Sequence, residues 1–145
     1  MADIRFTDAT QDDVKAVTDC IRAAYSKARE TIDDLPDVTG GLAQDIADHR
    51  VILALGNDEL VGVIIFAQQG DVMKVINLAV SPAAQGQGVA GKLLSRAEID
   101  ARDAGCTHME LRTHRLMQDT RAIYAHLGWV ETELAGNSVA MRKDL

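Results

Sequence analysis

The chain has 145 residues, of which 47% are hydrophobic and 26% are charged, and 22 acidic against 15 basic side chains give a formal net charge of −7. This length and composition are those of a folded globular protein with its own core, because disordered chains are less apolar and membrane-spanning chains contain far longer apolar runs. The acidic balance and an aromatic content of 3% disfavour nucleic-acid binding, since phosphate contacts need Lys and Arg and base stacking needs aromatic rings.

The N-terminal residues lack the basic and apolar regions of a signal peptide, so we expect a cytoplasmic protein with no membrane or nucleic-acid partner. The two cysteines, Cys20 and Cys106, suit a reducing compartment and have no metal-ligand spacing. We expect both to be small core residues, and we expect no metal site. No repeat, low-complexity tract or linker divides the chain, so residues 1–145 are predicted to form a single domain.

The first half of the chain predicts a strand, two helices and a three-stranded meander. Ile4 and Phe6 alternate with polar neighbours and indicate a short strand, and apolar residues every three or four positions over 12–29 indicate an amphipathic helix. A polar stretch over 30–41 separates this helix from a second, short one at 42–49. Apolar, β-branched runs joined by short turns then predict three hairpin strands. These strands are expected at 51–55, 60–67 and 72–80.

The second half of the chain alternates helices with strands. A helix over 89–105 has its apolar residues on one side and ends at Gly105, and a helix capped by Asp119 or Thr120 runs to Leu127. Further strands are expected at 107–112, 129–134 and 138–143. Three hairpin strands followed by strands that alternate with helices predict the α/β (α+β) class, with a mixed, mostly antiparallel central sheet and helices on both faces.

A glycine-rich turn, Gly86-x-Gly88-x-x-Gly91, lies between a strand and a helix, where backbone N–H groups and the helix dipole can hold a phosphate. The spacing fits the Rossmann dinucleotide fingerprint, and Glu110 follows Gly91 by 19 positions, near the place of a ribose-binding carboxylate. Against a dinucleotide-dependent oxidoreductase, residues 81–85 separate the strand from the first glycine, and only 54 residues follow Gly91. A turn that binds no ligand is a further alternative.

The same residues fit a second pattern. The segment 75–82 precedes Gln85-x-x-Gly88-x-Ala90, and Tyr124-x-x-Leu-Gly-Trp129 forms a second block near the end of the chain. Together these blocks resemble the acetyl-CoA segment and the closing motif of the GNAT superfamily of N-acetyltransferases. The expected order of elements is also similar to that fold, so the resemblance spans essentially the whole chain.

The resemblance implies that acetyl-CoA is the cosubstrate, without a metal. Backbone N–H groups of the turn would hold the pyrophosphate, and the end of the preceding strand would offer main-chain groups to the pantetheine arm and to the thioester oxygen. Thr120 stands where similar sequences carry Asn, and its hydroxyl can supply one hydrogen bond. The implied cofactor contacts are Leu78, Ala79, Val80, Gln85, Gly86, Gln87, Gly88, Val89, Ala90, Gly91 and Thr120.

The resemblance also implies two catalytic side chains. Tyr124 would protonate the departing thiolate, the alternative being a tyrosine that only packs in the core. Glu110 would accept the proton of the attacking amine, although Lys74 stands where some relatives carry a basic glutamate. His114 is a further base by its intrinsic pKa, but we expect it in a loop and facing solvent. Alternation places Glu110 and Leu111 on opposite faces of their strand without deciding which face meets the cleft.

The acceptor site in the family is formed by the segments corresponding to 25–41 and 113–117. The first contains Glu30, Asp33, Asp34 and Asp37, which form either a solvated charged segment or an acidic mouth that attracts a cationic amine. Residues 1–80 hold 14 acidic and 7 basic side chains, whereas residues 81–145 hold 8 of each.

The sequence therefore predicts direct transfer of an acetyl group to a primary amine of a small molecule or peptide, preferably a cationic one. Neither Cys20 nor Cys106 falls near the expected thioester, so no acyl-enzyme is expected. A non-catalytic CoA-binding module is the alternative function. Free sheet edges make a homodimer an expected assembly.

Overall fold

The computed structural model describes residues 4–34 and 40–145. Its strands are β1 (Ile4–Asp8), β2 (Arg50–Gly56), β3 (Glu59–Gln69), β4 (Val72–Val80), β5 (His108–His114), β6 (Val130–Ala135) and β7 (Ser138–Asp144). Its helices are α1 (Val14–Thr31), α2 (Leu42–Asp48), α3 (Val89–Asp103) and α4 (Gln118–His126), with short 3-10 turns η1 (Gln11–Asp13) and η2 (Pro82–Ala84). The order of elements expected from the sequence is confirmed.

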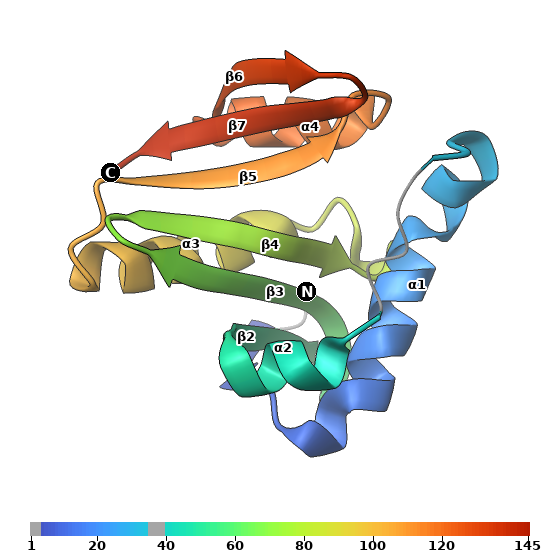
Figure 1. The fold of residues 1–145 in the computed structure, drawn as a ribbon. Helices are drawn as coiled ribbons and strands as arrows, with labels where there is room; N and C mark the ends of the chain where they lie inside the picture. The colour runs from blue at the N-terminus through green and yellow to red at the C-terminus, as the bar shows by residue number, and fades with distance from the viewer. Residues whose placement is uncertain (1–3, 35–39) are drawn as a thin grey trace.

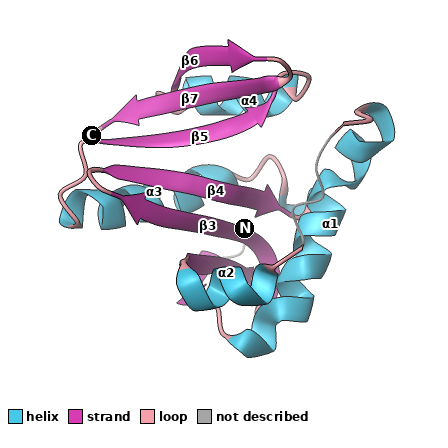
Figure 2. Ribbon diagram, viewed as in Figure 1, coloured by secondary structure: helices cyan, strands magenta, loops and turns pink. Residues whose placement is uncertain are grey.

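The strands form one seven-stranded sheet in the order β1-β2-β3-β4-β5-β7-β6. The β4–β5 pair is parallel and the other pairs are antiparallel. Helices α1 and α2 pack on one face of the sheet and α3 and α4 on the other (Figure 1, Figure 2). The mixed, mostly antiparallel sheet is thus confirmed, and it differs from the doubly wound parallel sheet of a Rossmann protein.

The parallel pair is short. β4 and β5 pair only at Val72 with His108, Met73 with Met109 and Lys74 with Glu110. Beyond these positions β4 continues along β3, β5 continues along β7, and the two strands diverge (Figure 1). A β-bulge at Ile76, where the β3–β4 register shifts, bends β4 at the point of separation. The sheet therefore opens into a V between β4 and β5.

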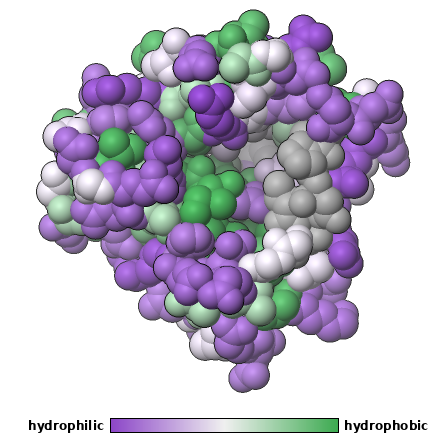
Figure 3. Space-filling model, viewed as in Figure 1, coloured by the Kyte–Doolittle hydropathy of each residue, from purple (hydrophilic) through white to green (hydrophobic). Residues whose placement is uncertain are grey.

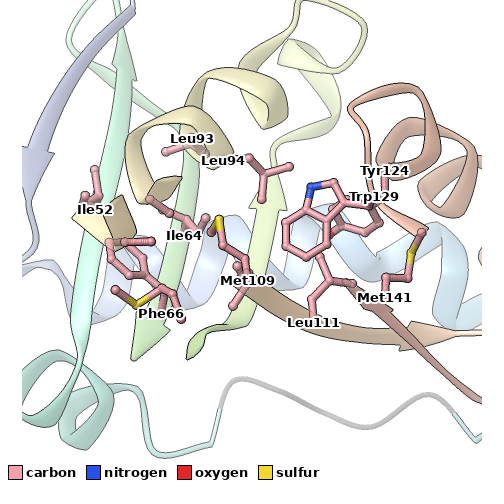
Figure 4. Close-up of a cluster of buried hydrophobic side chains, with 14 of the residues drawn as sticks. Ile52, Ile64, Phe66, Leu93, Leu94, Met109, Leu111, Tyr124, Trp129 and Met141 are labelled. Atoms are coloured by element: carbon pink, nitrogen blue, oxygen red, sulfur yellow. The ribbon is translucent and has the colours of Figure 1, made fainter. Parts of the chain in front are cut away.

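Two hydrophobic cores hold the layers together. On one face the apolar side of α3, including Leu93 and Leu94, packs on Ile64 and Phe66 of β3 and extends to Trp129 (Figure 4). On the other face Val17 and Ile21 of α1 pack against β2, β3 and β4. The predictions that Cys20 and Cys106 are core residues are confirmed, since their exposed fractions are 7% and 8%.

The ends of the elements follow local backbone rules in most places. Gly105 ends α3 with φ +80, as expected, and Asn57 and Asp58 turn the β2–β3 hairpin with φ values of 53 and 63. The expectation that Asp119 or Thr120 caps the next helix is wrong, because α4 begins at Gln118 with Met117 at its N-cap. Within the described ranges no helix is both long and apolar enough to cross a membrane.

Gly62 on β3 allows α3 to lie close to the sheet. A Cβ atom at this position would lie 3.0 Å from Val89 Cγ1, 3.0 Å from Leu93 Cδ1 and 3.2 Å from the Ala79 carbonyl oxygen. Val89 is the first residue of α3, so this contact also fixes where the helix begins relative to the end of β4.

We expect Gly62→Ala to lower the free energy of unfolding by about 1–3 kcal/mol, because the added methyl group pushes against a packed helix and a strand carbonyl. Urea denaturation measures the change. Gly40→Ala is the matched control, since nothing lies within 4 Å of a Cβ there, and its effect should stay within about 0.5 kcal/mol. Equal stability of Gly62→Ala and the wild type would contradict the close packing of α3.

Candidate active site

The glycine-rich turn has the conformation of an anion cradle. Gly86 and Gly88 have φ values of +82 and +79, which side chains other than glycine rarely adopt, and nothing lies within 4 Å of a Cβ at either position. The first bond of α3 runs from Lys92 N to the Gly88 carbonyl oxygen at 3.1 Å. The N–H groups of Val89, Ala90 and Gly91 therefore have no partner within the helix and can serve an anion.

Main-chain groups at the end of β4 face the V-shaped opening at every second residue. The carbonyl oxygen of Leu78 accepts a hydrogen bond from the Tyr25 hydroxyl and that of Val80 from Gln85 Nε2, each at 3.2 Å. Ser81 N, one residue on, bonds instead to the Val61 carbonyl oxygen of β3. Because the N–H and C=O of one strand residue point the same way, Leu78 and Val80 direct both groups toward the opening, and Ala79 directs its groups toward β3.

Tyr124 enters this region from α4. Its side chain is buried, with an exposed fraction of 6%, and its ring lies 5.9 Å from that of Trp129 at an interplanar angle of 57° (Figure 4). Burial raises the pKa of Tyr124 well above its ordinary value, and the nearby Tyr25 phenol raises it further. Tyr25 belongs to α1, which packs on the opposite face of the sheet from α4.

The Tyr124 hydroxyl has no hydrogen-bond partner among residues 4–34 and 40–145. In the same ranges, every side-chain nitrogen or oxygen that is sealed from solvent has a partner. An exposed fraction of 6% shows that the Tyr124 side chain is not fully sealed from solvent. An almost buried phenol without a partner among the described residues is available to a ligand.

Glu110 lies at the apex of the V, on the last position of β5 that pairs with β4. Its neighbour Leu111 packs in the core with α3 and α4, so Glu110 faces the side of α1 and α2. Its carboxylate lies 3.2 Å from His108 Nε2 and 4.0 Å from Lys74 Nζ. The predicted base is thus on the face opposite to the glycine turn and within a small group of charged and polar side chains.

His114 does not lie in a loop. It is the last residue of β5, its exposed fraction is 8%, and the expectation that it faces solvent is wrong. Its Nδ1 accepts a hydrogen bond from Leu116 N at 3.2 Å, so Nε2 carries the proton and donates it to Asp34 Oδ1 at 2.7 Å. Since both ring nitrogens are engaged, the neutral ring has no free lone pair to accept a proton from a substrate.

Asp34, which follows α1, is bonded to β5 and to the turn between β6 and β7. Its second carboxylate oxygen accepts a hydrogen bond from Asn137 Nδ2, in the turn between β6 and β7. We call Asp34, His114 and Asn137 the latch. One of the four acidic residues predicted to attract an acceptor is thus held by the protein itself, whereas Glu30 and Asp33 are exposed and Asp37 lies outside the described residues.

The surface on the side of α1 and α2 is hollowed near its middle, where hydrophobic side chains show between hydrophilic rims (Figure 3).

Two further residues predicted for the site are placed as follows. Thr120 is partly buried one turn before Tyr124 on α4. Gln87 donates a hydrogen bond from Nε2 to the Ala83 carbonyl oxygen at 3.4 Å, within the turn. Across the described part of the chain no group of three His, Cys, Asp or Glu side chains could hold a metal ion.

Comparison with known proteins identifies the family. The model of the acetyltransferase (GNAT) family matches residues 15–129. The chain belongs to the GNAT family of acetyltransferases. It is 30% identical over 123 residues to an aminoalkylphosphonate N-acetyltransferase of Salmonella typhimurium, which covers 79% of this chain and 80% of the relative.

Solved structures share the fold of this GNAT acetyltransferase at low sequence identity. PaiA N-acetyltransferase from Thermoplasma acidophilum, solved in complex with coenzyme A, aligns with a TM-score of 0.89 at 16% identity over 99% of each chain. A ribosomal-protein alanine N-acetyltransferase from Escherichia coli aligns with a TM-score of 0.81 at 16% identity, over 98% of this chain and 94% of that one. The protein is an acyltransferase, and its cosubstrate is acetyl-CoA, which the family uses.

The described residues fit acetyl-CoA. A pyrophosphate needs convergent N–H groups without side chains in the way, and the turn from Gly86 to Gly91 offers them. The pantetheine arm needs a strand edge without a strand partner, and Leu78 and Val80 provide one. The polar contacts of Asn77 and Asn137 in this acetyltransferase could not be predicted from the sequence, because their partners, Tyr25 and Asp34, come from distant segments.

The latch has a measurable electrostatic signature. Hydrogen bonds from Asn137, and next from His114, lower the pKa of Asp34 below its ordinary value of 3.8. A carboxylate whose pKa is lower when folded stabilises the fold fully above pH 3.8, and this contribution is lost as the pH falls through the folded pKa. We expect Asn137→Ala to bring the pKa of Asp34 back toward 3.8, as measured by NMR titration of its carboxyl carbon. An unchanged Asp34 pKa in this variant would show that the latch does not form.

Proposed function

We propose that this GNAT acetyltransferase transfers the acetyl group of acetyl-CoA directly to a primary amine of a small molecule or peptide. The observation that carries the proposal is the V-shaped opening, because it connects a phosphate-binding turn on one face with a polar acceptor side on the other. Tyr124 lies within it, and Glu110 lies at its apex. The relative from Salmonella typhimurium supports an amine acceptor, since its name describes N-acetylation.

The main chain does most of the binding in this proposal. Acetyl-CoA supplies an activated acetyl thioester when bound. The N–H groups of residues 86–91 bind its pyrophosphate, and Leu78 and Val80 bind the pantetheine arm at the free edge of β4. The Leu78 N–H donates to the thioester oxygen and stabilises the negative charge that develops there. Gln85 holds the turn against β4 through its bond to Val80, while Thr120 and Gln87 contribute polar side chains near the same arm.

We assign proton transfer to two side chains, which come from opposite faces of the sheet. Because burial keeps the Tyr124 phenol protonated at neutral pH, it acts as an acid and protonates the departing sulfur. Glu110 accepts the proton that the ammonium of the acceptor must lose before attack. Lys74 and His108 hold the carboxylate of Glu110 at the apex of the V. Neither cysteine takes part, since both are buried in the packed layers away from this opening.

The acidic segment at the end of α1 favours an acceptor with a positive charge. Glu30, Asp33 and Asp34 lie there, and the latch fixes the Asp34 carboxylate to the end of β5, which borders the opening, and to the turn between β6 and β7. A negative rim lowers the energy of an approaching ammonium group, so we propose that cationic amines are preferred. In the latch, Asp34 is engaged by His114 and Asn137, and these hydrogen bonds fix the position of its carboxylate at the rim.

The expected homodimer has a surface at which it can form. β6 is an outer strand of the sheet, its residues are exposed, and Val130 and Leu134 each have an exposed fraction of 65%. Pairing of two such edges is the assembly that we propose.

A panel of amines tests the proposed activity. The panel contains polyamines, amino acids, an aminoalkylphosphonate and basic peptides with a free N-terminus, and release of free thiol from acetyl-CoA reports transfer. We expect turnover with at least one primary amine and a steep fall of kcat/KM with added salt for cationic acceptors. Binding of acetyl-CoA without thiol release across the panel would instead favour the non-catalytic CoA-binding module.

Tyr124→Phe removes the proposed proton donor and tests its role. We expect kcat to fall by about 10²–10⁴-fold, because the sulfur would leave without a proton donor, while the affinity for acetyl-CoA stays within about twofold. Steady-state kinetics and calorimetric titration with acetyl-CoA measure the two effects. The ring that packs on Trp129 is kept in this variant, so an unchanged kcat would reduce Tyr124 to a packing role.

A further inference from the structure

A buried polar pair lies between α1 and the sheet, among otherwise apolar side chains. The hydroxyl of Tyr25 lies 3.2 Å from the side-chain oxygen of Asn77 and 3.2 Å from the main-chain carbonyl oxygen of Leu78. Asn77 has an exposed fraction of 7%. A buried amide in an apolar core is costly unless its polar atoms are used, so its presence here calls for a function.

Asn77 stands where β4 has left β5. It follows the β-bulge at Ile76, and its cross-strand partner on β3 is Ile65, which packs in the core under α1. Directly paired residues of antiparallel strands point to the same face, so Asn77 also points toward α1. It therefore borders the V-shaped opening on the acceptor side, next to Leu78, whose N–H is assigned to the thioester oxygen.

Hydrogen-bond counting decides which way the amide is turned. The Tyr25 hydroxyl has one hydrogen, and the Leu78 carbonyl can only accept. With the Asn77 oxygen toward Tyr25, two acceptors would compete for that hydrogen. Turning the amide by 180° exchanges its oxygen and nitrogen and gives every contact a donor, because Asn77 N–H then donates to the Tyr25 oxygen and Tyr25 O–H donates to Leu78. The chain of bonds thus favours an Asn77 oxygen that faces away from Tyr25.

The end of the amide that faces away from Tyr25 has access to the opening. Residues 4–34 and 40–145 provide no hydrogen bond to it, yet within these ranges no sealed side-chain polar atom lacks a partner. Asn77 keeps an exposed fraction of 7%, so its amide is not fully sealed from solvent. An almost buried amide thus presents one polar atom, without a partner among the described residues, next to the reacting groups.

We propose that Asn77 is a further catalytic residue whose side-chain oxygen accepts a hydrogen bond from the nitrogen of the acceptor amine, with Tyr25 as the residue that positions it. This role rests on the proposed function. As the nitrogen lone pair forms the new C–N bond, the nitrogen becomes positive and its N–H becomes a stronger donor, so the bond to Asn77 strengthens during attack.

The remaining electron and proton movements balance with the roles already assigned. The electron pair of the broken C–S bond leaves with sulfur, which takes a proton from Tyr124. Glu110 passes the first proton, taken from the ammonium before attack, to solvent, and it then accepts the second proton that the nitrogen loses as the C–N bond forms. Tyr124 regains its proton from solvent, so one turnover releases one thiol and one net proton. Asn77 gains and loses no proton, and it acts only by directing the nitrogen and stabilising its charge.

Three substitutions test this role in the full-length protein, with the best acceptor from the amine panel. Asn77→Leu keeps the volume and removes the oxygen, and we expect kcat to fall about 10–100-fold. Asn77→Asp keeps an acceptor oxygen on the side of the opening but cannot donate to Tyr25, so its kcat should fall less than that of Asn77→Leu. Tyr25→Phe removes the anchor and should reduce kcat by about tenfold. Acetyl-CoA affinity, measured by calorimetry, should stay within about twofold in each.

Thr18→Val is the matched control, since it removes a hydroxyl from the same helix that bonds only to the Val14 carbonyl oxygen at 2.8 Å, and kcat should not change. Wild-type kcat in Asn77→Leu, or an equal loss in Asn77→Asp and Asn77→Leu, would overturn the proposal while the acetyltransferase activity stands. If Asn77→Leu does not fold, as judged by its thermal melt, Tyr25→Phe decides, and wild-type kcat there overturns the proposal. Absence of turnover with every amine in the wild type would reject the proposed function and this role together.

Discussion

The short parallel pairing of β4 with β5 is the constraint on which the rest of the site depends. Three residue pairs hold the two halves of the sheet together, and the β-bulge at Ile76 then bends β4 away. Separation leaves main-chain N–H and C=O groups of β4 without a strand partner, which is costly in a protein interior. Tyr25 and Gln85 satisfy the two exposed carbonyl groups, and the N–H groups beside them remain for a ligand. The separation of the two strands thus leaves the edge of β4 at which the pantetheine arm is proposed to bind.

The opening also lets groups from the two faces of the sheet meet. A continuous sheet would keep Tyr25 on α1 and Tyr124 on α4 apart, separated by a layer of backbone. Here β4 and β5 have separated, and the Tyr25 phenol contributes to the raised pKa of Tyr124. In the proposed function, the face that carries the glycine turn serves acetyl-CoA, and the face that carries the acidic segment serves the acceptor amine.

The glycine turn shows how one spacing of residues serves two different folds. Gly86, Gly88 and Gly91 match a dinucleotide fingerprint, but the 3-10 turn Pro82–Ala84 separates them from the strand. Gly62 brings the start of α3 against β3, next to the end of β4, where a strand edge is free. In the proposed function the turn binds the phosphate, and the sheet beside it selects the rest of the ligand.

The sequence by itself determined the elements and the place of the glycine-rich turn, because both depend on neighbours within a few residues. Periodicity placed α1 and α3, and the glycines placed the turn, since positive φ values are a local requirement of the backbone. Tertiary structure decided which face Glu110 meets, the burial of His114 and the latch from Asp34 to Asn137. It also decided the contact of Tyr25 with Asn77. These contacts join residues separated by 52, 80 and 103 positions, and pairing over such distances is set by the packing of whole elements rather than by local pattern.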